Sequence, residues 1–296
     1  MPRVVSPVRT APKGWRSTKR RFVINMRFIN KFMPESESAC ELDTLSRIRG
    51  MFQAHDTPGN RVWGFTMDLA SGYHNFRLTE SQLELMGIAI HVSELPTGAI
   101  QWLRSHPSAR GCEDESAGLF YFTVVALPFG LGPSCAVFSD VVTALAAAWR
   151  RHSVCLRPVR LASYIDDFCV VAESVRAALV AAVELVYEAT AAGLSLNVEK
   201  CRLGPATRFI FLGTVVDTVS ATYSLSHPRA TRLTTQVADL VAATAHHDYV
   251  PAREVAQLLG LLWSASPCCP SGVTLLCRGL INTLTDERRH SVYDPA

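Results

Sequence analysis

Two adjacent aspartates in an apolar stretch constrain this 296-residue chain more than any other feature. Asp166 and Asp167 stand between the apolar segments 164–165 and 168–171. The two apolar runs within 159–172 predict a β-hairpin, in which adjacent side chains point to opposite faces. Burying two carboxylates among apolar side chains is costly unless cations compensate them, so the pair indicates a metal site on a hairpin turn. The alternative is an ordinary solvent-exposed turn.

A third carboxylate, Asp68, ends a second predicted strand over 62–68. Three carboxylates that converge from two strand ends can hold two Mg²⁺ ions at a separation of roughly 3.5–4 Å. Magnesium fits because it prefers oxygen ligands and substrate phosphates, and Mn²⁺ is an alternative ion. Taken alone, Asp68 is equally well explained as a cap at a strand end.

The rest of the chain alternates between strand-forming and helix-forming patterns. The segment 91–118 has little periodicity and holds Pro96 and Pro107, so it predicts a long surface loop. Gly193 is placed to end an Ala-rich helix as a C-terminal cap. Strands are predicted over 21–29, 119–126, 208–216 and 222–226, and helices over 35–53, 134–150, 174–192, 229–245, 251–264 and 272–284.

The composition is that of a globular chain, with 48% hydrophobic and 19% charged residues. No apolar run approaches the ~20 residues of a membrane-spanning helix, so we expect no membrane partner. Cysteines such as Cys135, Cys155 and Cys169 lie in apolar runs, which indicates buried thiols of an intracellular protein, cytoplasmic or nuclear rather than secreted. Basic residues crowd near the N-terminus, where they are expected to face phosphate: Lys13, Arg16, Lys19, Arg20, Arg21, Arg27 and Lys31.

Six segments resemble, in order, the successive motifs of reverse transcriptases, which are RNA-directed DNA polymerases. Their order and their spread over about residues 6–216 make coincidence remote. The segment 127–131, followed by the sequence 251–264, resembles retrotransposon enzymes more than telomerases or non-LTR elements. Within the retrotransposon enzymes, the resemblance is to the DIRS type with a tyrosine recombinase or to the LTR type. The six segments are 19–30 in the fingers, 65–74, 127–133 and 164–167 in the palm, and 193–200 and 211–213 after it.

The resemblance implies an α+β chain with the right-hand polymerase fold. Its fingers and a palm built on an antiparallel sheet plus helices would be followed by a partial helical thumb or connection. The implied boundaries are 1–67 for the fingers and the start of the palm, 68–216 for the palm with a loop insertion at 91–118, and 217–296 for the helical thumb or connection. The implied activity is transfer of deoxynucleotides to a primer 3′-hydroxyl on an RNA or DNA template. Ribonuclease H and recombinase or integrase regions are expected elsewhere in a larger polyprotein.

The resemblance also assigns roles at the metal site. Asp68 and Asp166 match the aspartates that bridge the metal ions, and Asp167 matches the third catalytic carboxylate. Leu69 joins these three aspartates among the implied metal ligands. Lys200 matches a candidate general acid for the departing pyrophosphate, although a surface lysine on a loop is the simpler explanation.

The remaining roles concern the substrates. By resemblance Lys13 and Arg21 grip the triphosphate, and the ring of Tyr73 blocks a 2′-hydroxyl. Without the resemblance, Arg21 would be an ordinary charged strand residue and Tyr73 a core aromatic. By resemblance, Phe129 and Gly130 pack on the nascent base pair, and the alternative is a plain loop-to-helix turn. Phe211, Leu212 and Gly213 match the primer grip, and the alternative is a plain strand end.

Two departures and two rival functions remain open. Asn25 stands where the family commonly has an aspartate, and the segment 91–118 is longer than usual.

One rival function is an RNA-binding scaffold that has lost catalysis, and the other is a metal-dependent nuclease or phosphatase. The intact aspartates argue against the scaffold. A nuclease would not explain Tyr73, the Pro-Phe-Gly turn and the basic fingers together.

Overall fold

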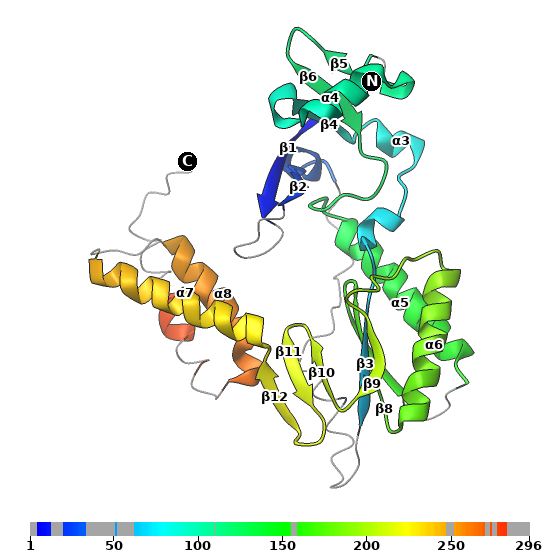
Figure 1. Ribbon diagram of the computed structural model, residues 1–296, viewed down its shortest axis with the longest axis vertical. Helices are drawn as coiled ribbons and strands as arrows, with labels where there is room; N and C mark the ends of the chain where they lie inside the picture. Colours follow the sequence, from blue (N-terminus) through cyan, green and yellow to red (C-terminus); the bar gives the residue numbers. More distant parts are fainter. Residues whose placement is uncertain are drawn as a thin grey trace. The chain divides into compact units, whose positions relative to one another are not determined.

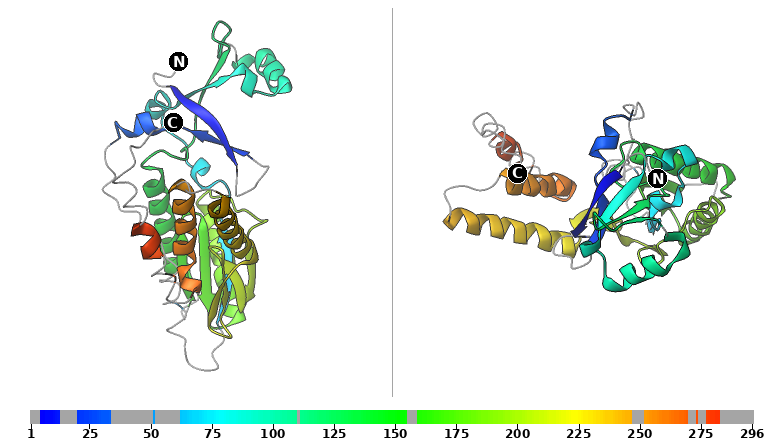
Figure 2. Two further views of the ribbon diagram at one scale, coloured as in Figure 1. Left: turned by 90° about the vertical axis from the view of Figure 1, so that its left-hand side faces the viewer. Right: turned by 90° about the horizontal axis from the view of Figure 1, so that it is seen from above.

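The computed structural model describes residues 5–12, 20–33, 51, 62–109, 111–154, 159–246, 252–269, 273 and 277–282. The chain divides into two compact units, and each unit is assembled from three stretches of sequence. Figures 1 and 2 show the helices and strands of both units. Unit 1 comprises Met1–Leu42, Asp68–His152 and Leu185–Glu199, and unit 2 comprises Asp43–Met67, Ser153–Glu184 and Lys200–Ala296.

Unit 1 is built on a five-stranded sheet in the order β2-β1-β4-β6-β5. Strands β1 and β4 pair in parallel, and the other neighbours pair antiparallel. The strands are β1 (Val5–Pro12), β2 (Arg20–Ile24), β4 (Gly87–His91), β5 (Glu113–Asp114) and β6 (Leu119–Thr123). The helices and turns are α1 (Arg27–Asn30), η1 (Gly72–Asn75), α3 (Glu80–Leu83), η2 (Val92–Glu94), α4 (Thr97–Ser105), η3 (Pro107–Ala109) and α5 (Ser134–His152).

The strand predicted over 21–29 ends early, at Ile24, and the short helix α1 follows. The side chain of Asn25 accepts a hydrogen bond from the backbone N–H of Arg27 at 3.2 Å, a local turn that stops the strand. Met26 and Ile29 then point into the core at helical spacing, with 2% and 5% of their surface exposed. The helix predicted over 35–53 lies outside the described residues except for Met51.

The prediction of a long surface loop over 91–118 is wrong. The segment contains α4, two 3-10 turns and β5, which pairs with β6. Pro96 precedes α4 in an extended conformation, and its carbonyl accepts the N–H groups of Ala99 and Ile100. Arg104 of α4 contacts Glu113 of β5 at 2.6 Å. The loop prediction failed because α4 buries only Leu103, too little apolar pattern to reveal a helix.

A hydrophobic cluster binds the parts of unit 1 together. Met26, which precedes α1, and Ile29 of α1 pack with Met86, Leu127 and Leu131, and all five are nearly fully buried. At roughly 1.5–3 kcal/mol for each fully buried large apolar side chain, this cluster is a main source of the unit's stability. Partly buried residues surround it: Ile24, Met33, Tyr73, Phe76, Leu78 and Val124.

Unit 2 contains the predicted hairpin and the predicted strand over 62–68 except for its last residue, Asp68, which belongs to unit 1, and both predictions are confirmed. A four-stranded sheet has the order β7-β8-β3-β9. A three-stranded antiparallel sheet follows in the order β10-β11-β12. The strands are β3 (Trp63–Asp68), β7 (Val159–Tyr164), β8 (Asp167–Ala172), β9 (Arg202–Ala206), β10 (Arg208–Phe211), β11 (Thr214–Asp217) and β12 (Thr222–Leu225).

The segment 208–216, predicted as one strand, is two strands joined by a tight turn. Leu212 and Gly213 form this turn at φ values of 47° and 72°. Two consecutive residues with positive φ produce the reversal that suits a two-residue hairpin. The sequence hides the turn because Leu212 is apolar and continues the strand pattern.

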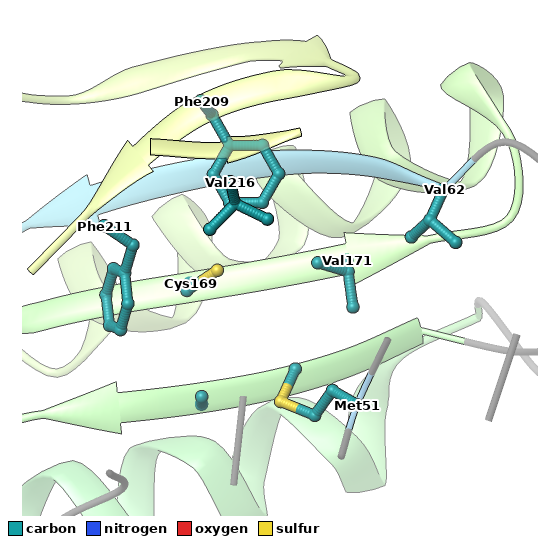
Figure 3. Packing of buried hydrophobic residues seen from close by; sticks show 8 residues of the cluster. Met51, Val62, Cys169, Val171, Phe209, Phe211 and Val216 are labelled. Carbon is teal, nitrogen blue, oxygen red and sulfur yellow. The ribbon is translucent and has the colours of Figure 1, made fainter. Parts of the chain in front are cut away.

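The core of unit 2 lies between these strands, as Figure 3 shows. Cys169 and Val171 on β8 are completely buried, and Phe209 and Phe211 of β10 pack in the same cluster. Burial raises the pKa of the Cys169 thiol far above its ordinary value, so this thiol stays protonated. The predicted burial of Cys169 is therefore confirmed.

Three of the predicted helices after the hairpin are confirmed, and within the segment 272–284 the described residues 273 and 277–282 are helical. The three helices are α6 (Val175–Ala191), which is divided between the units, and then α7 (His227–His246) and α8 (Ala252–Ala265), followed by the turn η4 (Ser266–Cys268). In Figures 1 and 2, α7 and α8 lie side by side. None of the helices in the described ranges is long and apolar enough to cross a membrane.

Candidate active site

The β7–β8 hairpin of unit 2 presents Asp166 and Asp167 at its turn. Tyr164 and Asp167 form the last pair of the hairpin, with Ile165 and Asp166 as the two turn residues. Ile165 has a φ of 55°, which a β-branched residue rarely adopts and which costs roughly 1–3 kcal/mol. Both aspartates are half-buried, and the following residues of β8 are completely buried. A rigid and strained turn therefore holds the two carboxylates.

Asp68 is the last residue of β3 and is 5% exposed. Within unit 1, its backbone carbonyl accepts the N–H of Asn197 at 2.9 Å, and Ala70 donates to Ser195 at 2.7 Å. Leu69 is 1% exposed and forms an isolated β-bridge with Leu196. The segment that follows Asp68 is thus fixed by the stretch after Gly193. The family resemblance identified the stretch after Gly193 as a later motif. It did not predict that this stretch contacts the segment that follows Asp68.

Strands β3 and β8 are neighbours in their sheet and run in opposite directions, as Figure 3 shows. Among the described residues, no group of three or more His, Cys, Asp or Glu side chains is arranged to hold a metal ion. The convergence of Asp68, Asp166 and Asp167 on metal ions therefore stays a prediction.

Unit 1 brings together two predicted nucleotide-binding residues that are far apart in the sequence. Tyr73 in η1 and Phe129 pack edge to face, with ring centroids 4.7 Å apart and planes at 88°. The ring of His74 lies 5.6 Å from Phe129, and Phe138 of α5 lies 5.1 Å from Tyr73. Phe129 is 49% exposed, so one face of this aromatic cluster is open to a ligand. Edge-to-face pairs of this kind contribute about 0.5–1.5 kcal/mol beyond burial.

The turn that carries Phe129 is fixed by several hydrogen bonds. Gly130 has a φ of 88°, a conformation that favours glycine. The hydroxyl of Ser134 donates to the carbonyl of Pro128 at 2.8 Å in a buried position. The side-chain amide of Asn30 contacts the turn twice, at Gly130 and Gly132. Asn30 lies in a segment that resembles the fingers motif, but its contact with this turn was not predicted.

The predicted basic residues are only partly described. Arg21 lies in β2, where its backbone pairs with Ala11. Lys13 lies outside the described residues. Lys200 is exposed and lies two positions before the start of β9, in keeping with a loop position. Their predicted contacts with phosphate stay predictions.

The predicted primer grip consists of the end of β10 and the turn after it. Phe211 is 3% exposed and belongs to the core of unit 2, whereas Leu212 and Gly213 form the turn. Arg229 of α7 donates to the carbonyl of Leu212 at 2.6 Å and to that of Ser264 in α8 at 2.8 Å. One guanidinium therefore ties this turn to both C-terminal helices. The sequence had not singled out Arg229.

Comparison with known proteins agrees with this architecture. A family model described as reverse transcriptase (RNA-dependent DNA polymerase) matches residues 11–216. The structure of the foamy viral protease-reverse transcriptase dRH in complex with ds DNA is similar, with a TM-score of 0.64 and 17% identity over 97% of this chain. The same viral protein in complex with RNA/DNA hybrid gives a TM-score of 0.57 and 16% identity over 95% of this chain.

This chain spans 40% and 33% of the length of those two solved chains. No curated protein sequence matches it. At such low identity the structural likeness concerns the fold, and it confirms the predicted mixture of helices with antiparallel sheet.

Proposed function

Because this chain belongs to the reverse transcriptase family, we propose that it is an RNA-directed DNA polymerase, which transfers deoxynucleotides to a primer 3′-hydroxyl on a template. The observation that carries the proposal is the placement of three aspartates at strand ends. Asp68 is the last residue of β3, Asp167 is the first residue of β8, and Asp166 lies in the turn just before it. In antiparallel neighbours the end of one strand and the start of the other share one edge of the sheet. This order supports convergence of the three carboxylates.

The donor set fits hard divalent cations. Reverse transcriptases generally use divalent metals. The carboxylates of Asp68, Asp166 and Asp167 and the backbone carbonyl of Leu69 would offer oxygen ligands, which Mg²⁺ prefers and Mn²⁺ also accepts. Two bound ions would stabilise the attacking and leaving oxygens of an in-line displacement. The strained turn at Ile165 supports this assignment, since strain of this kind clusters at functional sites.

Residues of unit 1 would position the nucleotide. The Tyr73–Phe129 pair presents a partly exposed aromatic surface, on which the ring of Tyr73 would exclude a 2′-hydroxyl. Phe129 and Gly130 would pack against the new base pair. Arg21 and Lys13 would hold the triphosphate, because guanidinium and ammonium groups bind phosphate oxygens well.

The other assignments concern the leaving group and the primer. Exposed Lys200 would protonate the departing pyrophosphate. Phe211 would support the primer grip from the core, while Leu212 and Gly213 would meet the primer. The foamy viral relatives were solved with ds DNA and with RNA/DNA hybrid, which supports a primer–template duplex as the ligand of this chain as well.

We also propose that the chain works inside the cell as part of a larger retrotransposon polyprotein. The solved relatives are longer than this chain and include a protease. Ribonuclease H and recombinase or integrase regions would be the partners. Domain boundaries at residues 67 and 216, separating fingers, palm and a helical thumb or connection, form part of the same proposal.

A primer-extension assay tests the proposal and separates it from its rivals. A 5′-labelled DNA primer is annealed to RNA or to DNA and incubated with the chain, Mg²⁺ and all four deoxynucleotides. Metal-dependent extension on the RNA template supports the polymerase. Binding without extension would instead indicate a scaffold that has lost catalysis, and shortening of the labelled strand a nuclease.

A further inference from the structure

We infer that Asn30 is a positioning residue that fixes the turn carrying Phe129 and Gly130 and so determines how well the chain selects deoxynucleotides. The inference rests on the proposed function and adds a residue to it. Asn30 is the last residue of α1 in unit 1. It touches no residue that the sequence marks as catalytic.

Two hydrogen bonds of equal length join Asn30 to the turn. Its Nδ2 donates to the carbonyl of Gly130 at 2.9 Å, and its Oδ1 accepts the backbone N–H of Gly132 at 2.9 Å. A side-chain amide carries a donor and an acceptor on one carbon, so it pairs with a backbone as another peptide group would. Ala, Ser and Asp cannot make both bonds in this place.

We call the two hydrogen bonds from Asn30 to the turn the clamp. The parts of unit 1 that the clamp joins are both held in place by other contacts. On one side, the backbone N–H of Asn30 donates to Met26 at 2.8 Å, and Met26 and Ile29 are buried. On the other side, Leu127 and Leu131 enclose the turn within the same cluster, at 6% and 7% exposed. A shift of the turn would therefore require the amide or the core to move.

The clamp acts on the nucleotide pocket through Phe129. Gly130, which accepts from Asn30, follows Phe129 directly, and the rings of Phe129 and Tyr73 pack edge to face with centroids 4.7 Å apart. Without the clamp, the peptide between Phe129 and Gly130 gains rotational freedom, because glycine tolerates many conformations. The aromatic surface beside the nucleotide sugar would then lose its fixed position. Selection against the 2′-hydroxyl, which needs a defined contact, should suffer more than binding of the duplex.

The test compares Asn30→Ala, Asn30→Asp and the control Asn25→Ala in single-turnover extension with dNTP and rNTP. Asn25→Ala removes a hydrogen bond at the start of α1 without touching the turn. Loss of two neutral hydrogen bonds is worth about 1–2 kcal/mol, hence roughly 5- to 30-fold. In Asn30→Ala we expect dNTP efficiency to fall by that factor while rNTP efficiency falls less. Primer–template affinity should stay near wild type, Tm should fall by only a few degrees, and Asn25→Ala should keep the wild-type ratio.

Amide hydrogen exchange gives a readout that does not need catalysis. The N–H of Gly132 should exchange faster in Asn30→Ala than in wild type and stay protected in Asn30→Asp, which keeps the acceptor. Unchanged exchange in Asn30→Ala would overturn the clamp. An unchanged dNTP-to-rNTP ratio, or equal loss of both with a lowered Tm, would overturn the selection role. A wild-type chain that extends no primer would instead refute the proposed function and with it that role.

Discussion

The residues predicted to carry the chemistry sit at points where the backbone is unusually constrained. Ile165 adopts positive φ beside Asp166, Ser71 has a φ of 52° two residues before Tyr73, and Leu212 is likewise left-handed in the primer-grip turn. Such conformations persist only where the surrounding structure stabilises them. Their occurrence beside predicted site residues agrees with a site that is formed before substrate binds.

Asp166→Asn should abolish metal-dependent extension. The substitution keeps the shape of the side chain but removes the negative charge that attracts a cation. We expect transfer to fall by at least about 10²-fold, the scale of losing one electrostatic stabiliser from an active site, with primer–template affinity largely intact. Gel-based extension and filter binding measure the two effects. Asp140→Asn, an exposed position on α5, is the control, and near-normal extension by Asp166→Asn would disprove the metal assignment.

Tyr73→Val should raise incorporation of ribonucleotides relative to deoxyribonucleotides. The valine side chain leaves room where the ring met Phe129 and would have met a 2′-hydroxyl. Competition between dNTP and rNTP on one template measures the ratio. Tyr73→Phe keeps the ring and should keep the selectivity. A ratio that does not change in Tyr73→Val would show that another residue excludes ribonucleotides.

Sequence reasoning found the aspartates, Tyr73 and Phe129, because their motifs are local. It missed Asn30 and Arg229, whose partners lie far away. Asn30 bonds to residues 100 and 102 positions later, and Arg229 bonds to Leu212 and Ser264, 17 and 35 positions away. An asparagine or arginine of this kind is indistinguishable from a surface residue until the chain is folded.

At the scale of elements, long and strongly patterned segments were predictable and short ones were not. The helices α5, α6, α7 and α8 and the β7–β8 hairpin were predicted near their observed bounds. The strands β1, β4, β5 and β9 were not predicted. Strand β5 has two residues, and it forms through pairing with β6 rather than through its own sequence.

Arg229→Met should loosen the primer-grip turn. It removes a charged donor from the carbonyls of Leu212 and Ser264, at a cost of roughly 1.5–3 kcal/mol for each charge-assisted bond. We expect a lower Tm and poorer extension at saturating dNTP, with little change in dNTP KM. Thermal unfolding and steady-state extension measure these effects. Arg253→Met, an exposed position on α8, serves as control, and a wild-type Tm in Arg229→Met would contradict the prediction.

The contact between α4 and β5 predicts a local pH dependence. The hydrogen bond from Arg104 lowers the pKa of the Glu113 carboxyl below its ordinary value of 4.5. A lowered pKa means that the contact stabilises the folded state above pH 4.5 and that this contribution is lost as the pH falls through the lowered value.

Arg104→Met should therefore move the Glu113 titration upward toward 4.5. Carbon-detected NMR of the side-chain carboxyl follows this midpoint directly. The carboxyl of Asp114 serves as an internal reference, because the largest cause of its lowered pKa is a hydrogen bond from the Ser116 hydroxyl. Its titration midpoint should therefore be the same in wild type and variant. A Glu113 midpoint that is the same in wild type and variant would show that Arg104 does not set it.

At the scale of the whole molecule, the sequence predicted family and fold class because six motifs are spread in order from residue 19 to residue 213. The family match over 11–216 confirms the family, and the likeness to solved structures confirms the fold class. The retrotransposon subtype depends on finer differences and stays a prediction. The two-unit arrangement was also beyond sequence reasoning. Each unit gathers stretches that local patterns treat as separate.

This interleaving of stretches has a consequence for how the chain is made. Unit 1 needs the stretch that ends at Glu199, and unit 2 draws on residues from Asp43 to the C-terminus. A ribosome releases the chain from its N-terminal end, at about 5–20 residues per second. The strand β3 must therefore leave the ribosome and wait several seconds, unpaired, until β8 and β9 have been synthesised. During that interval its apolar edge is a target for chaperones and for aggregation, which makes slow translation of residues 68–200 a hazard for the yield of folded protein.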